Sequence, residues 1–444
     1  MRIAYVTESF PPDVNGVAHT AVRVAEHLVS RGHEPLVIAP EPARGLALPD
    51  RTLGFPVVRV RSLGLPVYPG FRVGLPGRAV RDAIARHRAD LVHLAGPFVL
   101  GAGGCAAAKS LGIPIVSVYA TDLPAYARSY HTGRIGQGAC WRRLRSIHNA
   151  CDRTLAPCTA TAADLDANGI ERVWIWARGV DSVRFDPAKR SEAMHAQFAP
   201  NGELVVGYVG RLAAEKRVDL LAEVSRLPGV RLVIVGSGPA EALIRKAVPD
   251  ALYLGQRIGA DLATIYASLD AFVHSGPHDT FGQTLQEAAA SGLPVIAPAA
   301  GGPIDLVRDG VTGFLVTPGE GAALAAAVAR LKAEPGLRAA QGRAARQMVL
   351  GRSWPVMCDQ LIGHYQAILQ ARGSGQAART TSLEAEAASL EAEAALLASG
   401  QAIVTSAHQF LAAENELLAS DVALRRAGES RQEGEGTQRE EVVA

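Results

Sequence analysis

The stretch Leu204-Val-Val-Gly-Tyr-Val-Gly-Arg-Leu-Ala-Ala-Glu-Lys-Arg217 decides the fold of this chain. It opens with a short apolar run, which is typical of a strand buried in a parallel sheet, and the run ends in glycine and charged residues. Further apolar runs follow it at Val230–Val235, Ala251–Leu254, Ala271–His274, Pro294–Ala297 and Gly313–Val316. Helical patterns lie between them at Val218–Arg226, Ala240–Ala247, Gln283–Ala290 and Gly321–Glu334. This alternation predicts a parallel sheet covered by helices.

The same alternation precedes this stretch. Strands are expected at Ile3–Thr7, Pro35–Ala39, Val57–Val60, Leu91–Leu94, Ile115–Tyr119 and Arg153–Ala156, with helices such as Ala18–Arg31 and Gly104–Leu111 between them. Turn-forming Gly179, Asp181 and Pro187 mark a linker at Arg178–Arg190. The sequence therefore predicts an α/β protein with two doubly wound Rossmann-like domains facing a central cleft, where a ligand would bind at the carboxyl ends of the strands.

The last part of the chain differs in kind. One amphipathic helix is expected from Ser353 to about Ala371, and a break is expected at 372–375. The heptad Ser-Leu-Glu-Ala-Glu-Ala-Ala then occurs twice, from Ser382 and from Ser389, which favours a helical tail that packs through its leucines. The expected organisation is an acceptor domain at 1–178, a donor domain at 179–352, a helix at 353–371 that crosses back to the first domain, and an accessory, partly disordered tail at 372–444 that could self-associate.

Composition and charge narrow the functional classes. The chain has 444 residues, 48% of them hydrophobic and 20% charged, as in ordinary globular proteins. It has five cysteines without a CxxC pair, and neither a signal sequence nor an apolar run of membrane-spanning length is recognisable. We therefore expect a cytoplasmic protein with reduced thiols.

Charge is distributed unevenly. Residues 1–150 carry 18 basic and 9 acidic side chains, whereas 372–444 carry 6 and 12. A basic first half suggests an anionic partner, such as the inner face of the plasma membrane, and no nucleic-acid motif accompanies the charge. Trp141, Leu144 and Ile147 follow helical spacing among arginines, so this segment is either a membrane-surface helix or a core-packed helix with its arginines outside.

Two segments carry cationic or backbone groups suited to phosphate. Gly16 lies in the loop Glu8-Ser-Phe-Pro-Pro-Asp-Val-Asn-Gly-Val17 between the first strand and the first helix, where it would let helix amides approach a phosphate. In the second half, Arg211 follows a strand end, and Lys216 comes five residues later. These two cations can converge on one diphosphate without a metal ion.

The most informative segment for function is His274-Ser-Gly-Pro-His-Asp-Thr-Phe-Gly-Gln-Thr-Leu-Gln-Glu-Ala288. It places Asp279 in a loop after a strand, a helix start near Gly282, and Glu287 about one turn into that helix. The two acids are too far apart to share one ligand atom, but they could bind two ends of a nucleotide sugar. Simple helix-terminal charges are the alternative interpretation.

Together these segments resemble the retaining glycosyltransferases of the GT-B fold, family 4, above all the actinobacterial GDP-mannose-dependent α-mannosyltransferases that act on phosphatidylinositol mannosides and related glycolipids. The resemblance covers about residues 1–371 and also includes Thr121-Asp-Leu-Pro-Ala-Tyr-Ala-Arg128, Arg178-Gly-Val-Asp181 and Ala299-Ala-Gly-Gly-Pro303. It implies roles for the residues that match the family's motifs. Gly16, Arg211 and Lys216 would hold the donor diphosphate, Asp279 with the amides of Phe281, Gly282 and Gln283 would contact the transferred sugar, and Glu287 would bind the ribose.

Two positions depart from the family pattern. The first acid of the pair is normally Glu, and Asp279 is shorter by about 1.5 Å, roughly one C–C bond. Many relatives carry His where this chain has Ala120, which leaves Asp122 as the nearest polar candidate for a catalytic contact. No metal site is expected, because Asp164-Leu-Asp166, which matches a metal-binding DxD by letters, lies in a helical pattern.

The sequence thus predicts a metal-independent hexosyltransferase that uses a nucleotide-sugar donor and requires no cofactor, with GDP-mannose as the expected donor and a glycolipid or similar molecule as acceptor. Two alternatives stay open. One is a UDP-sugar transferase with a soluble or natural-product acceptor, and the other is a catalytically silent sugar-nucleotide binder whose tail recruits partners. The feature that distinguishes them is whether Asp279 engages a sugar.

Overall fold

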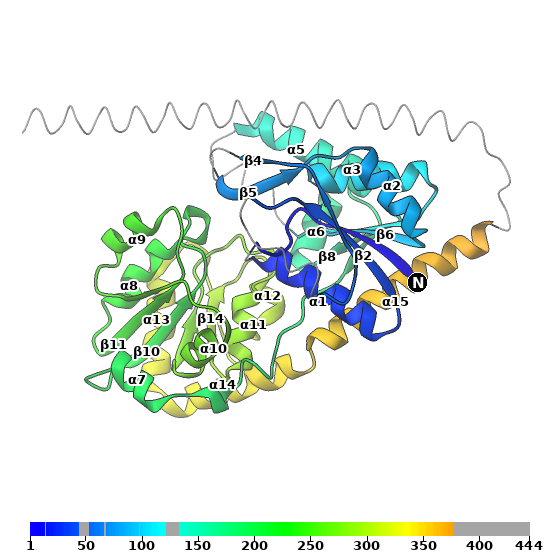
Figure 1. Ribbon diagram of the computed structural model, residues 1–444. Helices are drawn as coiled ribbons and strands as arrows, with labels where there is room; N and C mark the ends of the chain where they lie inside the picture. The colour runs from blue at the N-terminus through cyan, green and yellow to red at the C-terminus, as the bar shows by residue number, and fades with distance from the viewer. Residues whose placement is uncertain (14, 44–52, 66–67, 97, 121–132, 377–444) are drawn as a thin grey trace, which may run out of the picture. The chain divides into compact units, whose positions relative to one another are not determined.

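The first half of the chain is built on a parallel sheet of seven strands. The computed structural model describes residues 1–13, 15–43, 53–65, 68–96, 98–120 and 133–376 (Figure 1). In spatial order the strands are β3 (Val57–Val60), β2 (Glu34–Pro40), β1 (Arg2–Val6), β6 (Leu91–Leu94), β7 (Ile115–Val118), β8 (Arg153–Ala156) and β9 (Val173–Ile175). The order reverses at β1, as in a doubly wound sheet, and every pair in the ladder is parallel.

The second half repeats the arrangement with six parallel strands. Their order is β12 (Leu252–Gly255), β11 (Val230–Val235), β10 (Leu204–Val209), β13 (Ala271–Val273), β14 (Val295–Pro298) and β15 (Gly313–Val316). The predicted pair of doubly wound α/β domains is therefore confirmed. The order reverses between β10 and β13, so the loops after these two strands, which carry Arg211 and Asp279, leave the same edge of the sheet.

Helices connect the strands. Those of the first half are α1 (Gly16–Ser30), α2 (Arg78–His87), α3 (Val99–Ser110), α5 (Gly133–His148) and α6 (Thr159–Ala167). Those that follow are α7 (Glu192–Phe198), α8 (Ala222–Ser225), α9 (Glu241–Ala247), α10 (Gly259–Ala267), α11 (Gln283–Ala290), α12 (Pro303–Leu306), α13 (Gly321–Ala333), α14 (Pro335–Leu350) and α15 (Trp354–Gln376). Short 3₁₀ turns occur at Pro187–Lys189, Ala214–Lys216 and Val218–Leu221.

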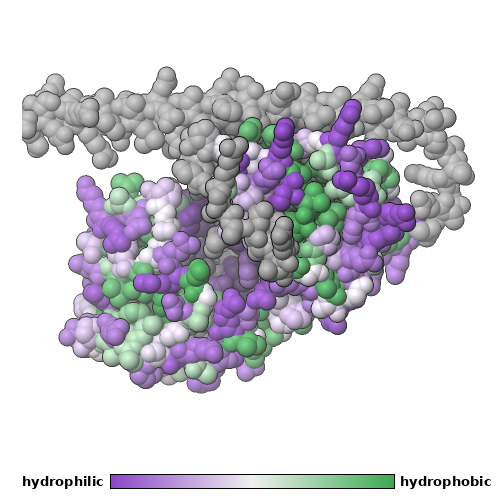
Figure 2. All heavy atoms as spheres, viewed as in Figure 1, coloured by the Kyte–Doolittle hydropathy of each residue, from purple (hydrophilic) through white to green (hydrophobic). Residues whose placement is uncertain are grey.

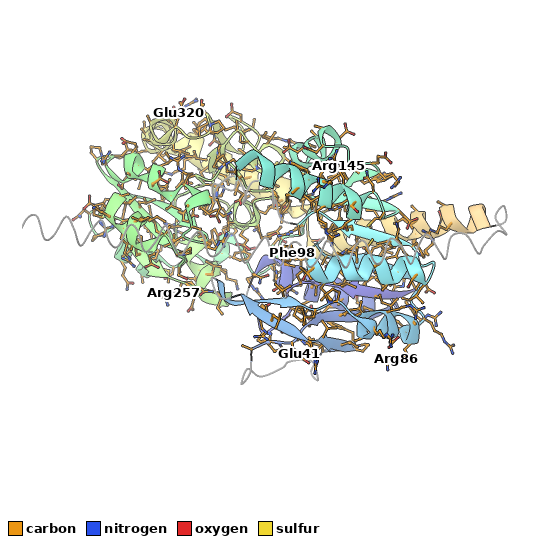
Figure 3. The ribbon with its side chains drawn as sticks, turned by 90° about the horizontal axis from the view of Figure 1, so that it is seen from above. Glu41, Arg86, Phe98, Arg145, Arg257 and Glu320 are labelled. Atoms are coloured by element: carbon orange, nitrogen blue, oxygen red, sulfur yellow. The ribbon has the colours of Figure 1, made fainter. Side chains whose placement is uncertain are left out.

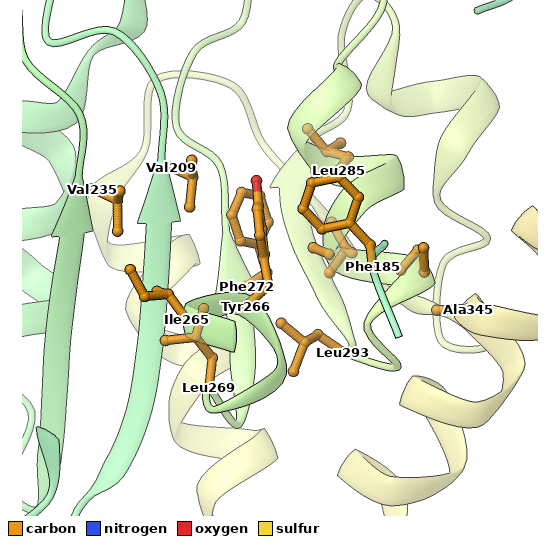
Figure 4. Packing of buried hydrophobic residues seen from close by; sticks show 14 of the residues in the cluster. Phe185, Val209, Val235, Ile265, Tyr266, Leu269, Phe272, Leu285, Leu293 and Ala345 are labelled. Atoms are coloured by element: carbon orange, nitrogen blue, oxygen red, sulfur yellow. The ribbon is translucent and has the colours of Figure 1, made fainter. Parts of the chain in front are cut away.

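Both faces of the second sheet are packed. One face carries a cluster with Phe185, Tyr266, Phe272 and Leu285, which Figure 4 shows between the sheet, α10 and α11, with Ala345 of α14 at its side. The other face carries Tyr208, Leu232 and Ile234 against α13. Burial on both faces explains why these strands are continuous apolar runs rather than alternating ones.

The last helix belongs to the core of the first half. Trp354, Leu361 and Tyr365 of α15 pack in one cluster with Ile3 and Tyr5 of β1. The indole of Trp176 donates a hydrogen bond to the carbonyl of Met357 over 2.8 Å. α15 therefore closes one face of the first sheet, although it follows the entire second half in sequence.

Several elements differ from the sequence prediction. The break expected at 372–375 is wrong for the described part of the chain, because α15 continues to Gln376 and Arg372 binds the Asp152 carboxylate at 2.9 Å. The helix expected at Val218–Arg226 is a 3₁₀ turn followed by the four-residue α8. β9, and the two-stranded sheet formed by β4 (Ser62–Leu65) and β5 (Tyr68–Gly74), were not predicted. The predicted tail beyond Gln376 lies outside the described residues.

α5 settles one alternative left open by its sequence. Leu144 and Ile147 are buried, and Trp141 packs against the same small cluster, while Arg142 and Arg145 are exposed. The apolar stripe thus faces the protein core. Of the two interpretations, the structure supports the core-packed helix, with Arg142 and Arg145 outside and Arg143 half-buried.

Candidate active site

The loop after β10 presents the first candidate cation. Arg211 lies two residues beyond the strand end, and its guanidinium contacts the carboxylate of Glu215. Glu215 sits in the following 3₁₀ turn and is almost fully buried, whereas about a third of the Arg211 side chain is exposed. The Tyr208 hydroxyl donates to the carbonyl of Arg211 over 3.2 Å. The loop therefore holds the arginine by both its backbone and its side chain.

Lys216 and Asp279 meet although 63 residues separate them in sequence. The lysine ammonium contacts one carboxylate oxygen of Asp279, and Nε2 of His274 lies 2.9 Å from the other oxygen. The His274 side chain is 2% exposed and that of Asp279 is 17% exposed. Burial alone would raise the pKa of Asp279, but Lys216 and His274 outweigh it and hold the pKa well below its usual range. The carboxylate is therefore ionised at neutral pH.

The backbone around Asp279 is fixed by the loop after β14. The amide of Gly302 donates to the carbonyl of Asp279 over 2.8 Å. A Cβ added to Gly302 would lie 2.1 Å from the carbonyl oxygen of Phe281, so only glycine allows this approach. Gly282 caps α11 with φ at 93°, the left-handed region that favours glycine. The glycines of both loops are thus needed to place the acid.

The start of α11 leaves backbone donors available. The amides of Phe281 and Gly282 donate no hydrogen bond to any described residue. The Gln283 side chain turns away from the acid, and its amide group donates to the carbonyl of Gly179 over 3.1 Å. Free amides at a helix start carry partial positive charge and suit an anionic or hydroxyl-bearing ligand.

Glu287 lies one turn into α11 and contacts Tyr266 of α10. The Tyr266 hydroxyl, itself buried, donates to Oε2 of Glu287 over 3.2 Å. Burial raises the pKa of Glu287 to about 7, against the opposing effects of the Tyr266 hydrogen bond and of Arg184. This carboxylate accordingly titrates near neutral pH in the free protein.

In the first half, Gly16 begins α1. The side chain of Asn15 accepts hydrogen bonds from the amides of Val17 and Ala18 at 3.1 and 3.0 Å and so caps the helix. A Cβ added to Gly16 would lie 3.2 Å from the guanidinium of Arg178, so this glycine also admits a neighbouring cation. Asp122, the other first-half candidate, lies outside the described residues.

The predicted site residues therefore fall into separate contacts. Lys216 joins Asp279, Arg211 joins Glu215, and Glu287 joins Tyr266, while Gly16 lies beside Arg178. Glu215, Tyr266 and Arg178 were not predicted to belong to the site, and His274 was predicted only to end a strand. Glu215 and Arg178 lie inside motifs that the sequence shows, but no sequence pattern includes Tyr266.

Within the described part of the chain, no group of three or more His, Cys, Asp and Glu side chains is arranged to hold a metal ion. Asp164 and Asp166 lie in α6, so the prediction that this DxD is helical is confirmed. None of the helices in the described ranges is long and apolar enough to cross a lipid bilayer.

Comparison with solved structures identifies the fold. The chain is similar to sucrose-phosphate synthase from Thermosynechococcus elongatus, with a TM-score of 0.66 at 20% identity, over 83% of this chain and 99% of that one. This likeness supports the GT-B fold that was predicted.

Sequence comparison then gives the family. A model described as Glycosyltransferase Family 4 matches residues 14–184, and one described as Glycosyl transferases group 1 matches 189–348. The chain is 49% identical over 380 residues to a GDP-mannose-dependent alpha-mannosyltransferase of Mycobacterium tuberculosis, covering 85% of this chain and 99% of the relative. An enzyme of the same description from Mycolicibacterium smegmatis is 47% identical over 374 residues, with 84% and 99% coverage. The chain belongs to glycosyltransferase family 4, as its motifs predicted, and is a transferase.

Proposed function

We propose that this enzyme transfers an α-mannosyl group from GDP-mannose to a hydroxyl of a glycolipid or similar acceptor, with retention of configuration. The observation that carries the proposal is the contact between Lys216 and Asp279. It joins Lys216, which we propose binds the diphosphate, to the acid that we propose touches the transferred sugar. The two mycobacterial relatives, which share nearly half of the residues over most of the chain, support GDP-mannose as donor.

The residues around this contact suit departure of a diphosphate. As the bond from the sugar C1 to the phosphate oxygen breaks, negative charge grows on the leaving diphosphate. Arg211, Lys216 and the amides at the start of α11 would meet that charge. The acceptor hydroxyl attacks C1 from the same face and passes its proton to the leaving phosphate oxygen. Asp279 would hold the sugar, and Glu287 the ribose.

A donor panel tests the proposal. Purified full-length protein is given GDP-mannose, GDP-glucose or UDP-glucose with a lipid extract, and the released nucleoside diphosphate is measured. We expect release from GDP-mannose to exceed release from the other donors. Preference for UDP-glucose would favour the UDP-sugar alternative, and binding of a donor without turnover would favour the silent binder.

Glu287 gives a prediction about pH. Ribose hydroxyls donate a stronger hydrogen bond to a carboxylate than to a neutral carboxylic acid. GDP affinity should therefore decrease as the pH is lowered below about 7, the pKa of Glu287, by up to about tenfold per pH unit. In Glu287→Gln, affinity at pH 8 should be about tenfold weaker and this pH dependence should be lost. Calorimetry between pH 6 and 8 checks both expectations.

Two controls separate Glu287 from other titrating groups. Guanosine has no phosphate to titrate, so it must show the same pH dependence as GDP. Tyr266→Phe removes a hydrogen bond to the ionised carboxylate and should move the midpoint to higher pH. Equal affinities of the parent protein and Glu287→Gln across this range would remove Glu287 from the ribose site.

We further propose peripheral attachment of the first half to anionic lipid. Figure 2 shows hydrophilic side chains projecting from the first half with apolar surface between them, and Figure 3 shows Arg86 on α2 and Arg145 on α5, both exposed. Since the apolar stripe of α5 is buried, attachment would rest on charge, at about 1 kcal/mol per basic residue near the surface. The tail beyond Gln376 stays a proposed self-association segment.

Vesicle sedimentation tests this attachment. We expect binding to vesicles with anionic phospholipid at low ionic strength, loss of binding as salt is raised, and no binding to zwitterionic vesicles. Arg142→Glu together with Arg145→Glu should weaken binding, and Arg330→Glu in the second half is the matched control. Equal binding to both vesicle types would favour a soluble acceptor.

A further inference from the structure

A pocket in the first half contains polar groups that the proposed chemistry has not used. It is lined by Tyr5 of β1, Thr20 of α1, Trp176 and Arg178, among apolar side chains that include Val118. The pocket opens to solvent, and its enclosed part has room for about one water-sized group. The lining comes from the carboxyl ends of the first sheet's strands and from α1, which is where doubly wound domains bind ligands.

Arg178 is a cation without a matching anion. Among the described residues its guanidinium forms no ion pair, and Nη1 lies beside Gly16. The carboxylate that acts on it electrostatically is Asp279, which already contacts Lys216 and His274. The Arg178 side chain is half-buried and lines the pocket, and burial lowers its pKa. A guanidinium in this position, with no described carboxylate paired to it, can donate to an oxyanion of a ligand.

Tyr5 provides a second, independent observation. Its side chain is 1% exposed, and its hydroxyl has no hydrogen-bond partner among the described residues. Because Tyr5 lines the pocket, its hydroxyl can donate a hydrogen bond to a ligand oxygen there. Thr20, by contrast, is satisfied, because its hydroxyl donates to the carbonyl of Gly16 over 2.7 Å. Tyr5 and Arg178 therefore offer donors to one small space.

We infer that Arg178 and Tyr5 form a subsite that binds one oxyanion group, a phosphate or a carboxylate, of a substrate. The inference rests on the proposed function, because it gives the acceptor domain a charged ligand. The oxyanion has two sources, an acidic group of the acceptor or the donor diphosphate. The planar guanidinium suits either one, since it can donate two parallel hydrogen bonds to the oxygens of a phosphate or a carboxylate.

Calorimetry on the full-length chain tests the subsite. The donor site is first saturated with GDP, and sn-glycerol 3-phosphate, glucuronate or neutral glucose is then titrated. If the subsite belongs to the acceptor, the parent should bind at least one of the two anions and should not bind glucose. Arg178→Gln should weaken that binding at least about tenfold, Tyr5→Phe less, and Arg178→Lys should keep part of it. Arg86→Gln, an exposed arginine on α2, is the matched control and should match the parent.

Each outcome decides the inference. If Arg178→Gln binds the anion more weakly than the parent does but binds GDP equally well, the subsite belongs to the acceptor. GDP affinity weakened about tenfold by Arg178→Gln, with no second anion bound, assigns it to the diphosphate. If Arg178→Gln changes neither affinity, the inference is overturned. If Arg178→Gln does not fold, Arg178→Lys and Tyr5→Phe carry the test. If the parent itself binds no GDP, the proposed function fails, and the same anions titrated without GDP still compare Arg178→Gln with the parent.

Discussion

Replacing Asp279 with asparagine is expected to lower kcat at least about 100-fold while leaving GDP affinity within about threefold of the parent. Asp279 contacts the half-buried Lys216 and lies 2.9 Å from the buried His274, so its charge orients both partners. Asparagine keeps the shape of the side chain but removes its charge. Lys216 then loses its ion pair, and the hydrogen bonds to the sugar become weaker. GDP lacks the sugar, so its binding should depend little on this residue. Donor turnover and GDP calorimetry check the two halves of the prediction.

Two further variants make this result interpretable. His274→Asn removes the second partner of the carboxylate, so a smaller loss of kcat with unchanged GDP affinity would mark His274 as a positioning residue. Asp279→Glu adds roughly one C–C bond, about 1.5 Å, and restores the usual acid of the family. If Asp279→Asn turns over donor as fast as the parent, Asp279 does not engage the sugar in the reaction.

Replacing Arg211 with alanine should reduce kcat/KM about 30-fold, the equivalent of about 2 kcal/mol. The guanidinium is partly exposed, and its contact with Glu215 fixes its direction. Its removal costs the charge that would stabilise the leaving group. Steady-state release of GDP from GDP-mannose measures the effect.

Loss of Arg211 also leaves Glu215 buried without its cation, which by itself destabilises the protein. The double variant Arg211→Ala with Glu215→Gln removes that penalty. It should recover thermal stability without recovering activity. Full activity of Arg211→Ala would exclude Arg211 from the diphosphate site.

The sequence predicted the strands better than the contacts between side chains. Parallel strands are buried on both faces, so most strands of both sheets are short runs of consecutive apolar residues. Such a run can be recognised in the sequence without knowledge of the neighbouring strands. β9 was not predicted although Val173–Ile175 is an apolar run, and as an edge strand it exposes Trp174 and Ile175. The glycines within 372–375 predicted a break in the helix. Instead α15 continues to Gln376, and Arg372 pairs with Asp152, a residue far away in sequence.

The candidate site was predictable to the extent that its motifs are local. Arg211, Lys216, Asp279 and Glu287 each stand in a short segment with a recognisable pattern. Their partners come from other segments: Tyr266 reaches Glu287 from α10, and Arg178 reaches Gly16 from the linker. Those contacts depend on sheet order and helix packing, which a single sequence does not specify residue by residue.

The placement of α15 has a consequence for how the chain folds during synthesis. Trp354, Leu361 and Tyr365 complete the core around Ile3 and Tyr5, so the half that leaves the ribosome first lacks one wall until the other half has been made. We expect a nascent chain ending before Trp354 to hold a finished second half and an open first half with exposed apolar surface. Chaperone contacts should therefore concentrate on the N-terminal sheet and end only when the last helix emerges.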